Sequence, residues 1–478
     1  MEQYSKFFDR VNVIAKKLNE WITSGEIIYI ISNYEADGIA ASAILIKLIL
    51  NLEGKFHLRF VDYIDKEWII KYIDEFKNRI EEGYFVFLDI GSTTLHYLNK
   101  LFPHNKVIVL DNDYLRSKSG NYDLLYFNLE ELNIDGELEI STSGITYYVA
   151  RAICQLNIEL GSLGLIEDLL PFGIIGALGD NQDKGEMHGL LGLNKLILDD
   201  CKELKLIDEQ KGPRFFRQES HILNSLLETI EPYLNGLTNN KKAISDLLIK
   251  LNIPLNITLK DLSNQKISEL NSELIKYTPA RKDIVGINYI FLNEMPKSVL
   301  RDAREYAILL NACGRLNFPS TGLRVCLGDR GTQLREATDL YKKYRDSITF
   351  YLDWISTPDN LIEKSLVQCI LGGSIITNRI IIPIISIALK NHILNPNKIV
   401  LGYLQYKKDV NIIYGINPFQ GENKKINIWE VIKQTNKKLK IDTKTIGNRK
   451  KAIVKISNKI NIKEYLDILE SIIKKQIE

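Results

Sequence analysis

One short stretch near the start of the chain constrains its fold most strongly. Residues 27–31 form an uninterrupted apolar run that is typical of a buried strand. A polar turn with Glu35 and Asp37 follows, and residues 39–50 then favour a helix. In an open α/β sheet ligands bind where strands end, so these two carboxylates could converge on one hard cation. The alternative is that the helix dipole simply favours acidic residues at a helix N-terminus.

Four more strands are predicted in the first 200 residues, with helical stretches between most of them. They are residues 57–61, 84–88, 107–110 and 124–127. This alternation indicates an α/β fold with a parallel, doubly wound sheet. Acidic residues recur after the apolar segments, and we expect them to share one cleft at the sheet edge, although Asp also starts turns and caps helices. The acids are Glu35, Asp37, Asp89, Asp111, Asp113 and Asp180.

The rest of the chain is predicted to form a helical connector and a second, smaller α/β domain. Residues 201–285 have the pattern of helices and turns, so we expect them to connect domain 1–200 to domain 286–478. The predicted elements of the second domain are strands at 286–292 and 323–329, helices at 299–316 and 332–355, a hairpin at 398–417 and a C-terminal helix from about residue 462.

Composition limits the classes of partner and the compartment. The 478 residues are 45% hydrophobic and 26% charged with a net charge of +2, so any nucleic-acid binding must come from local patches. The five cysteines are far apart and form no CxxC pair, which disfavours a zinc site and fits a reducing cytoplasm. No uninterrupted apolar stretch is long enough for a membrane span, so no membrane association is expected.

The acidic motifs resemble those of the DHH phosphoesterase superfamily, and specifically its archaeal RecJ-like branch. That branch includes the GINS-associated nuclease and the RecJ-like subunit of the replicative CMG helicase. Residues 32–42, SNYEADGIAAS, resemble the family's first motif, and Asp89 and Asp180 match aspartates of the second and fourth motifs. The DHH triplet itself falls on residues 111–113, and residues 300–330 resemble the archaeal DHH-associated domain.

The resemblance implies a DHH domain, a DHH-associated domain and a catalytic metal site. Active members hold two manganese ions that activate water against a phosphodiester. Asp37, Asp89, Asp111 and Asp180 would be the catalytic residues, and Glu35 and Asp113 would join them as ligands of Mn²⁺ or Mg²⁺. The sequence departs from the family at four positions: active members have histidine where this chain has Asn33, Asn112 and Asp113, and aspartate where it has Glu35. An all-oxygen site stays chemically possible; a vestigial site would bind no metal.

The second domain departs from the family as well. Its glycine-rich substrate loop is reduced in residues 445–456 to Gly447 and Ala452, and residues 410–415 lack an expected arginine. We therefore expect an inactive or weak nuclease homologue of DNA replication that binds single-stranded DNA and associates with GINS and the MCM helicase in a cytoplasmic, nucleoid-associated setting. The alternative is an active manganese-dependent exonuclease on single-stranded DNA or RNA. A third hypothesis is a phosphoesterase that acts on small nucleotides.

Five residues are candidates for contacting nucleic acid. Asn311 and Arg315 match family positions that contact it, but helix capping and a surface ion pair would explain them too. Ser143 and Gly144 open a helix whose N-terminus could take a phosphate, although ordinary capping is equally consistent. Arg449 lies in a basic run that could follow a DNA strand or form a solvated face.

Overall fold

The computed structural model groups the chain into two compact units. One unit contains residues 1–220 and 285–342, and the other contains residues 221–284 and 343–478. The structure describes the whole chain except residues 1–3, 76–82, 114–121, 159–162, 217–218, 408–409, 419–425, 442, 444, 448, 457–459 and 478. In the described part, no helix has both the length and the apolar character needed to cross a membrane.

The first unit is built on a five-stranded sheet in the order β2-β1-β3-β4-β5, and every neighbouring pair is parallel. The strands are β1 (Ile27–Asn33), β2 (Lys55–Val61), β3 (Tyr84–Leu88), β4 (Val107–Leu110) and β5 (Leu125–Tyr126). The predicted doubly wound α/β fold is confirmed. The strand order reverses between β1 and β3, and the carboxyl ends of strands at such a point are where open α/β sheets bind ligands.

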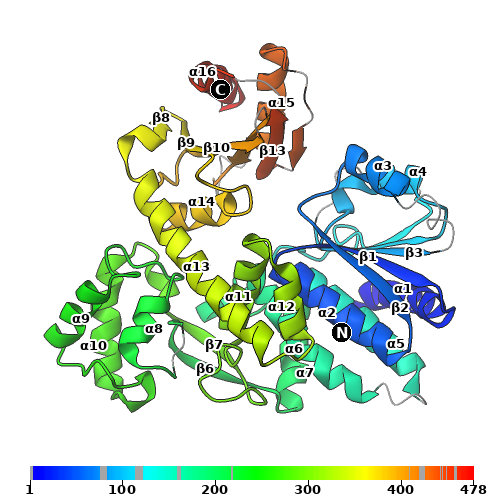
Figure 1. Ribbon diagram of the computed structural model, residues 1–478, viewed down its shortest axis with the longest axis horizontal. Helices are drawn as coiled ribbons and strands as arrows, with labels where there is room; N and C mark the ends of the chain where they lie inside the picture. The colour runs from blue at the N-terminus through cyan, green and yellow to red at the C-terminus, as the bar shows by residue number, and fades with distance from the viewer. Residues whose placement is uncertain are drawn as a thin grey trace. The chain divides into compact units, whose positions relative to one another are not determined.

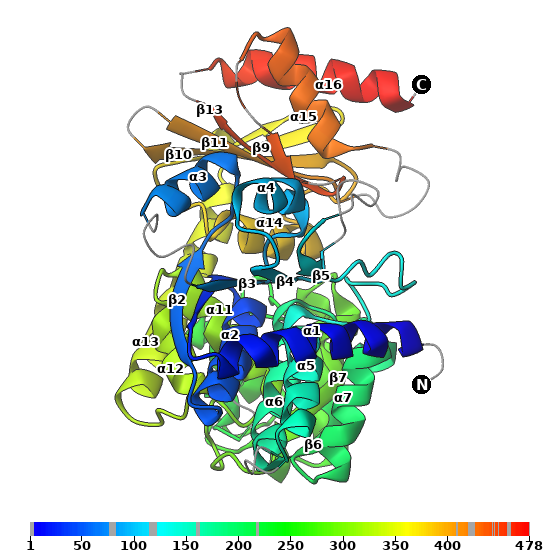
Figure 2. The same ribbon diagram turned by 90° about the vertical axis from the view of Figure 1, so that its right-hand side faces the viewer.

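Helices cover both faces of this sheet (Figure 2). On one face lie α3 (Lys66–Glu75) and α4 (Leu95–Leu101); on the other lie α1 (Ser5–Thr23), α2 (Ala36–Asn51) and α5 (Thr142–Leu156). Phe85 and Phe87 of β3 are fully buried under α3 and α4 with Leu98. Because β1, β3 and β4 are buried on both faces, they are nearly continuous apolar runs, which is why the sequence pattern locates them well.

Two segments outside the sheet complete this unit. The first contains α6 (Leu163–Gly179), α7 (Gly192–Glu203) and β6 (Ile207–Pro213); the second contains β7 (Val285–Phe291), α11 (Ala303–Arg315) and α12 (Pro319–Cys326). They are joined by antiparallel pairing of β6 with β7 and by packing of α11 on α6 and α2. The predicted strand at 323–329 is wrong, because α12 begins with Pro319 at its first position and ends before Gly328, at φ +109°.

The second unit contains a mixed six-stranded sheet in the order β12-β13-β11-β10-β9-β8 (Figure 1). Its strands are β8 (Leu361–Glu363), β9 (Val367–Gly373), β10 (Ile399–Lys407), β11 (Val410–Ile416), β12 (Thr445–Gly447) and β13 (Lys451–Ile456). The β10–β11 pairing confirms the predicted hairpin, while two residues of its expected turn, 408 and 409, lie outside the described residues. β10 pairs in parallel with β9.

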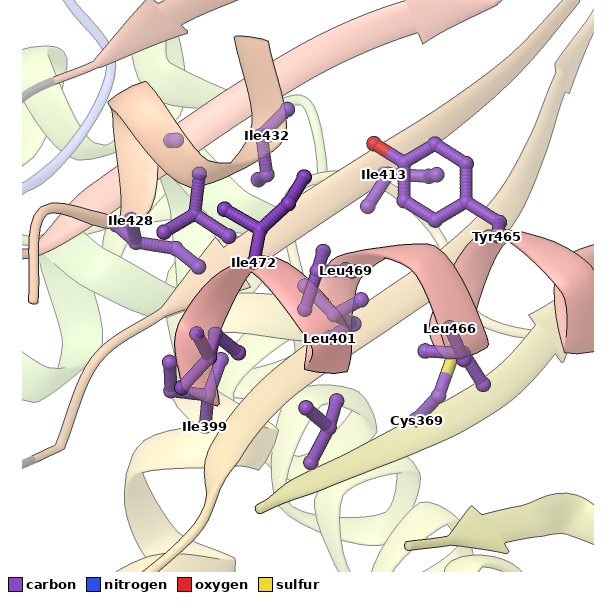
Figure 3. Close-up of a cluster of buried hydrophobic side chains, with 14 of the residues drawn as sticks. Cys369, Ile399, Leu401, Ile413, Ile428, Ile432, Tyr465, Leu466, Leu469 and Ile472 are labelled. Atoms are coloured by element: carbon purple, nitrogen blue, oxygen red, sulfur yellow. The ribbon is translucent and has the colours of Figure 1, made fainter. Parts of the chain in front are cut away.

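The core of this second sheet lies against the last two helices. Tyr465 and Leu469 of α16 (Ile462–Ile477) face Leu401 and Ile413 of the strands, and all four side chains are fully buried (Figure 3). The helix α15 (Ile428–Lys438) packs on the same cluster. The other helices of the unit are α8 (Ile222–Glu228), α9 (Lys241–Lys250), α10 (Asn264–Leu274) and α14 (Ile381–Lys390), and α13 (Thr332–Ile355) contains the unit boundary.

Residues 285–342 group with the first unit, whereas the sequence places residues 286–342 with the second domain. The reason is local packing: β7 pairs with β6, and α12 packs on α11 and α2. The division into domains at residues 200 and 285 stays a prediction. The packing has one consequence for function, because it places α11 beside the acidic turn after β1.

Candidate acidic site

Three of the predicted acids lie at the carboxyl ends of neighbouring strands. Asp37 is in the first turn of α2 after β1, while Asp89 and Asp111 directly follow β3 and β4. Asp180 reaches the same place differently, because it follows the C-terminus of α6 and not a strand. Asp180 therefore joins the acids at the sheet edge from the end of a helix.

Asp37 is buried and held by the N-terminus of α5. Its Oδ2 lies 2.7 Å from the backbone nitrogen of Thr142, and its Oδ1 lies 2.8 Å from that of Ser143. Both N–H groups donate to the carboxylate, which the helix dipole also favours. Burial raises the pKa of Asp37, and the hydrogen bonds from Ser143 and Thr142 oppose that rise. Gly176 of α6 permits the packing, since an added Cβ would lie 2.2 Å from Asp37 Oδ1.

Asp111 is likewise buried with both carboxylate oxygens engaged. The backbone N–H of Ser92 donates to Oδ2 at 2.9 Å, and that of Asp113 donates to Oδ1 at 3.2 Å. Burial raises the pKa of Asp111, while these hydrogen bonds lower it. The side chain of Asp113 is exposed.

Asp89 is the electrostatic centre of the group. Burial raises its pKa well above the ordinary range, and the charges of Asp37, Asp180, Asp111 and Asp113 raise it further. Four other carboxylates thus lie close enough to act on Asp89. Its backbone has φ +56°, an unusual conformation for a residue with a side chain. The structure therefore brings five of the six predicted acids together.

An amide network that the sequence did not reveal ties these acids to each other. Asn112 Nδ2 donates to the Gly136 carbonyl at 2.8 Å and to Asp180 Oδ2 at 3.2 Å, while Thr142 Oγ1 donates to Asn112 Oδ1 at 2.9 Å. Gln182 Nε2 donates to the same Asp180 oxygen at 3.1 Å. The only sequence signals for Thr142 and Gln182 are the polar residues around them, which are common in turns.

Glu35 pairs with α11. Its Oε1 lies 3.0 Å from Nε of Arg315, whose side chain is 12% exposed. Asn311, also on α11, accepts a hydrogen bond from the backbone N–H of Ala36 at 2.9 Å and donates to the Gly179 carbonyl at 3.1 Å. In this structure the candidate nucleic-acid residues Asn311 and Arg315 thus hold the ends of α2 and α6.

The other candidate nucleic-acid residues lie in two places. The first three N–H groups of α5 are all occupied internally, since Asp37 accepts from Thr142 and Ser143, and Ser141 Oγ accepts from Gly144. A phosphate at this helix end would have to displace Asp37. Arg449 is exposed and belongs to the second unit.

The donor set was compared with the needs of a divalent metal. Carboxylate oxygens suit Mn²⁺ and Mg²⁺, and a cation would relieve the repulsion that raises the pKa of Asp89. However, both oxygens of Asp37 and of Asp111 already accept backbone hydrogen bonds. Nowhere in the described ranges do three acidic, histidine or cysteine side chains stand so that they could hold one ion. As arranged, these residues do not fit a two-metal centre.

Comparison with known proteins gives a consistent fold. No family model matches the sequence. An uncharacterized protein of Methanocaldococcus jannaschii, MJ0831, is 28% identical over 305 residues, which are 63% of this chain and 64% of that protein. The similarity thus spans less than two thirds of the length of MJ0831.

Solved structures extend the likeness to nearly the whole chain. Cdc45 from Entamoeba histolytica matches with a TM-score of 0.66 and 11% identity over 98% of this chain and 99% of that one. RecJ from Thermus thermophilus, solved in complex with Mn²⁺, matches with a TM-score of 0.56 and 13% identity over 98% of this chain and 55% of that one. A DHH domain described as a member of the s1p family of ribosomal proteins matches with a TM-score of 0.53 and 13% identity, over 99% and 92%.

The chain therefore has an α/β fold of the kind seen in DHH domains. Within that class, the chain has the fold shared by RecJ and Cdc45.

Proposed function

We propose that this chain is a RecJ-like replication protein that binds single-stranded nucleic acid and hydrolyses it weakly or not at all. The observation that carries the proposal is the engagement of Asn112, which accepts from Thr142 and donates to Asp180. The resemblance implies a histidine at this position in active members. An amide nitrogen has no lone pair to offer a metal, and here it instead ties down an acid that would be a ligand.

Nucleic-acid binding is proposed for Arg315 and Arg449, whereas the buried side chain of Asn311 is engaged within the protein. The net charge of +2 means that binding depends on such local groups. Arg315 is paired with Glu35, so a phosphate would compete with that carboxylate for the guanidinium. Fluorescence anisotropy with a labelled single-stranded oligonucleotide tests this directly. We expect saturable binding that weakens as salt rises, and a duplex of the same length should bind less tightly.

Association with GINS and MCM is proposed from the likeness to Cdc45 over almost the full length of both chains. A nucleoid-associated location would follow from it. Pull-down with purified GINS and MCM is the test. We expect the immobilised chain to retain GINS and MCM. It should not retain an unrelated complex of similar charge.

The second candidate function is a manganese-dependent exonuclease with an all-carboxylate site. The observation in its favour is the raised pKa of Asp89 among four other carboxylates, because a bound cation would offset that repulsion. Calorimetric titration with Mn²⁺ distinguishes the two. Saturable binding that disappears in both Asp37→Ala and Asp180→Ala would support the exonuclease, and binding that is unchanged in both would eliminate this site.

A further inference from the structure

One face of α11 contacts three consecutive residues, 34–36, between the end of β1 and Asp37. The contacting residues of α11 are spaced i, i+3 and i+4, so they lie on the same side of the helix. They are Asn311, Gly314 and Arg315, and they contact Ala36, Tyr34 and Glu35 respectively. An added Cβ on Gly314 would lie 1.9 Å from the Tyr34 carbonyl oxygen, so the two backbones touch. Three consecutive residues of the turn are thus fixed from a segment almost 280 residues away in the sequence.

Asn311 makes the connection that matters most for the site. Its side chain is buried, and its two polar atoms serve two different helix ends, the N–H of Ala36 and the carbonyl of Gly179. Ala36 directly precedes Asp37, and Gly179 directly precedes Asp180. The two helix ends also touch, since a Cβ on Gly179 would lie 2.5 Å from the Ala36 Cβ. One amide therefore bridges the backbones that carry two of the clustered acids.

We propose that Asn311 is a positioning residue of the acidic site. It contacts neither carboxylate, and it acts through the backbones of Ala36 and Gly179. If either contact is lost, a buried polar group is left unpaired, which is unfavourable. The amide thereby keeps the end of α2 in register with the end of α6, so that the Asp37 carboxylate meets Thr142 and Ser143 on α5. This role concerns the geometry of the site and holds whether the site binds a metal, a proton or neither.

Hydrogen exchange at the N-terminus of α5 tests the proposal, because the N–H groups of Thr142 and Ser143 donate to Asp37. The side-chain hydrogen bonds of Asn311 go to Ala36 and Gly179 and not to these two residues. In Asn311→Ala we expect their amide exchange to accelerate by about tenfold, as for the loss of one to two hydrogen bonds. Amides of β3 serve as the internal reference and should not change. Faster exchange of Ala36 alone, with Thr142 and Ser143 as in the wild type, would overturn the proposal.

A matched control separates positioning from general destabilisation. Asn436 is also a buried amide that joins two elements, since it donates to Thr445 Oγ1 at 3.4 Å and accepts from the Tyr465 hydroxyl at 2.9 Å. It belongs to the second unit. Asn436→Ala should leave exchange at Thr142 and Ser143 unchanged. If it accelerates that exchange as much as Asn311→Ala does, the effect is global and the proposal fails.

Gly314→Ala provides a second test that keeps the Asn311 side chain. On helix propensity alone the substitution favours α11, because alanine is the better helix former. The added methyl group would nevertheless force the Tyr34 carbonyl away from α11. We expect faster exchange at Thr142 and Ser143 despite the better propensity. Unchanged or slower exchange there would show that the contact of α11 with the turn does not position Asp37.

Discussion

The side-chain nitrogen of Asn112 lies 3.2 Å from Oδ2 of Asp180 and donates a hydrogen bond to it. These residues are 68 positions apart and come from the end of β4 and the end of α6. Asn112 follows Asp111 in the sequence, and its side chain binds Asp180, the Gly136 carbonyl and Thr142. The first prediction concerns this side chain.

Asn112→His should destabilise the protein and should not create a nuclease by itself. Asn112 is buried, and its side chain is in hydrogen-bond contact with the Gly136 carbonyl, Asp180 and Thr142, so little room is available for a larger ring. Overpacking of this kind costs about 1–3 kcal/mol. Denaturant unfolding measures the loss, and Asn288→His offers a comparison at another buried asparagine of the same unit. A gain in stability, or new manganese-dependent hydrolysis, would contradict the account.

Asp89→Asn should change how stability depends on pH. The pKa of Asp89 is raised in the folded state, so the folded protein keeps this proton at pH values where the unfolded chain has lost it. The contribution of Asp89 to stability is therefore fully present below the ordinary pKa of an aspartate and declines as the pH rises through the raised value. Asparagine cannot ionise, so the stability of Asp89→Asn relative to the wild type should increase with pH.

Denaturant unfolding at several pH values between 4 and 8, approximately, measures this difference. Asp246→Asn, at an exposed position of the second unit, is the control for the loss of one carboxylate. If the Asp89→Asn difference does not change with pH, or changes no more than that of the control, the carboxylates do not act on one another as described.

Asp183→Asn should be strongly destabilising. Asp183 Oδ2 lies 2.5 Å from Nη2 of Arg214, and both side chains are at most 9% exposed. Burial alone would raise the pKa of Asp183, but the hydrogen bond with His188 and the charge of Arg214 outweigh it and hold the pKa below its ordinary value. Removing one member of a buried pair costs about 3–5 kcal/mol. In the wild type this contribution is present above the ordinary pKa of an aspartate and is lost as the pH falls.

Thermal or denaturant unfolding checks the cost, with Asp200→Asn as the matched control. Asp200 pairs with Arg151 at 2.8 Å, but both side chains are about one third exposed. A pair of this kind is worth about 0–1 kcal/mol. Equal losses in the two variants would show that burial does not govern the Asp183 pair.

Glu35→Gln should strengthen the proposed binding of single-stranded DNA. The substitution removes the charge that competes with DNA for Arg315. The free energy of DNA binding should therefore become more favourable by about 0.5–1 kcal/mol, or roughly a two- to fivefold gain in affinity. The salt dependence of binding should also steepen, because Arg315 would become available to one more phosphate. Anisotropy titrations at several salt concentrations measure both. Glu26→Gln removes the same charge at an exposed position before β1 and should have no such effect. Weaker binding by Glu35→Gln would show that Arg315 does not contact the DNA.

The sequence predicts the centre of the parallel sheet well, because β1, β3 and β4 are buried on both faces and are therefore apolar. It also locates Asp37, Asp89 and Asp111, since each follows such a strand. It fails where contacts over long sequence distances decide the structure. Nothing local indicates that Asn311 caps both α2 and α6. The segment 323–329 has the apolar content of a strand, but Pro319 starts a helix there.

The central claim is that this acidic site is closed by internal hydrogen bonds and does not drive hydrolysis. The most direct measurement is a time course of a labelled single-stranded oligonucleotide with the purified chain and Mn²⁺, beside the Asp37→Ala variant. The account predicts that the oligonucleotide is bound but stays full length, with no more shortening by the wild type than by Asp37→Ala. Progressive manganese-dependent shortening by the wild type, absent in Asp37→Ala, would contradict it.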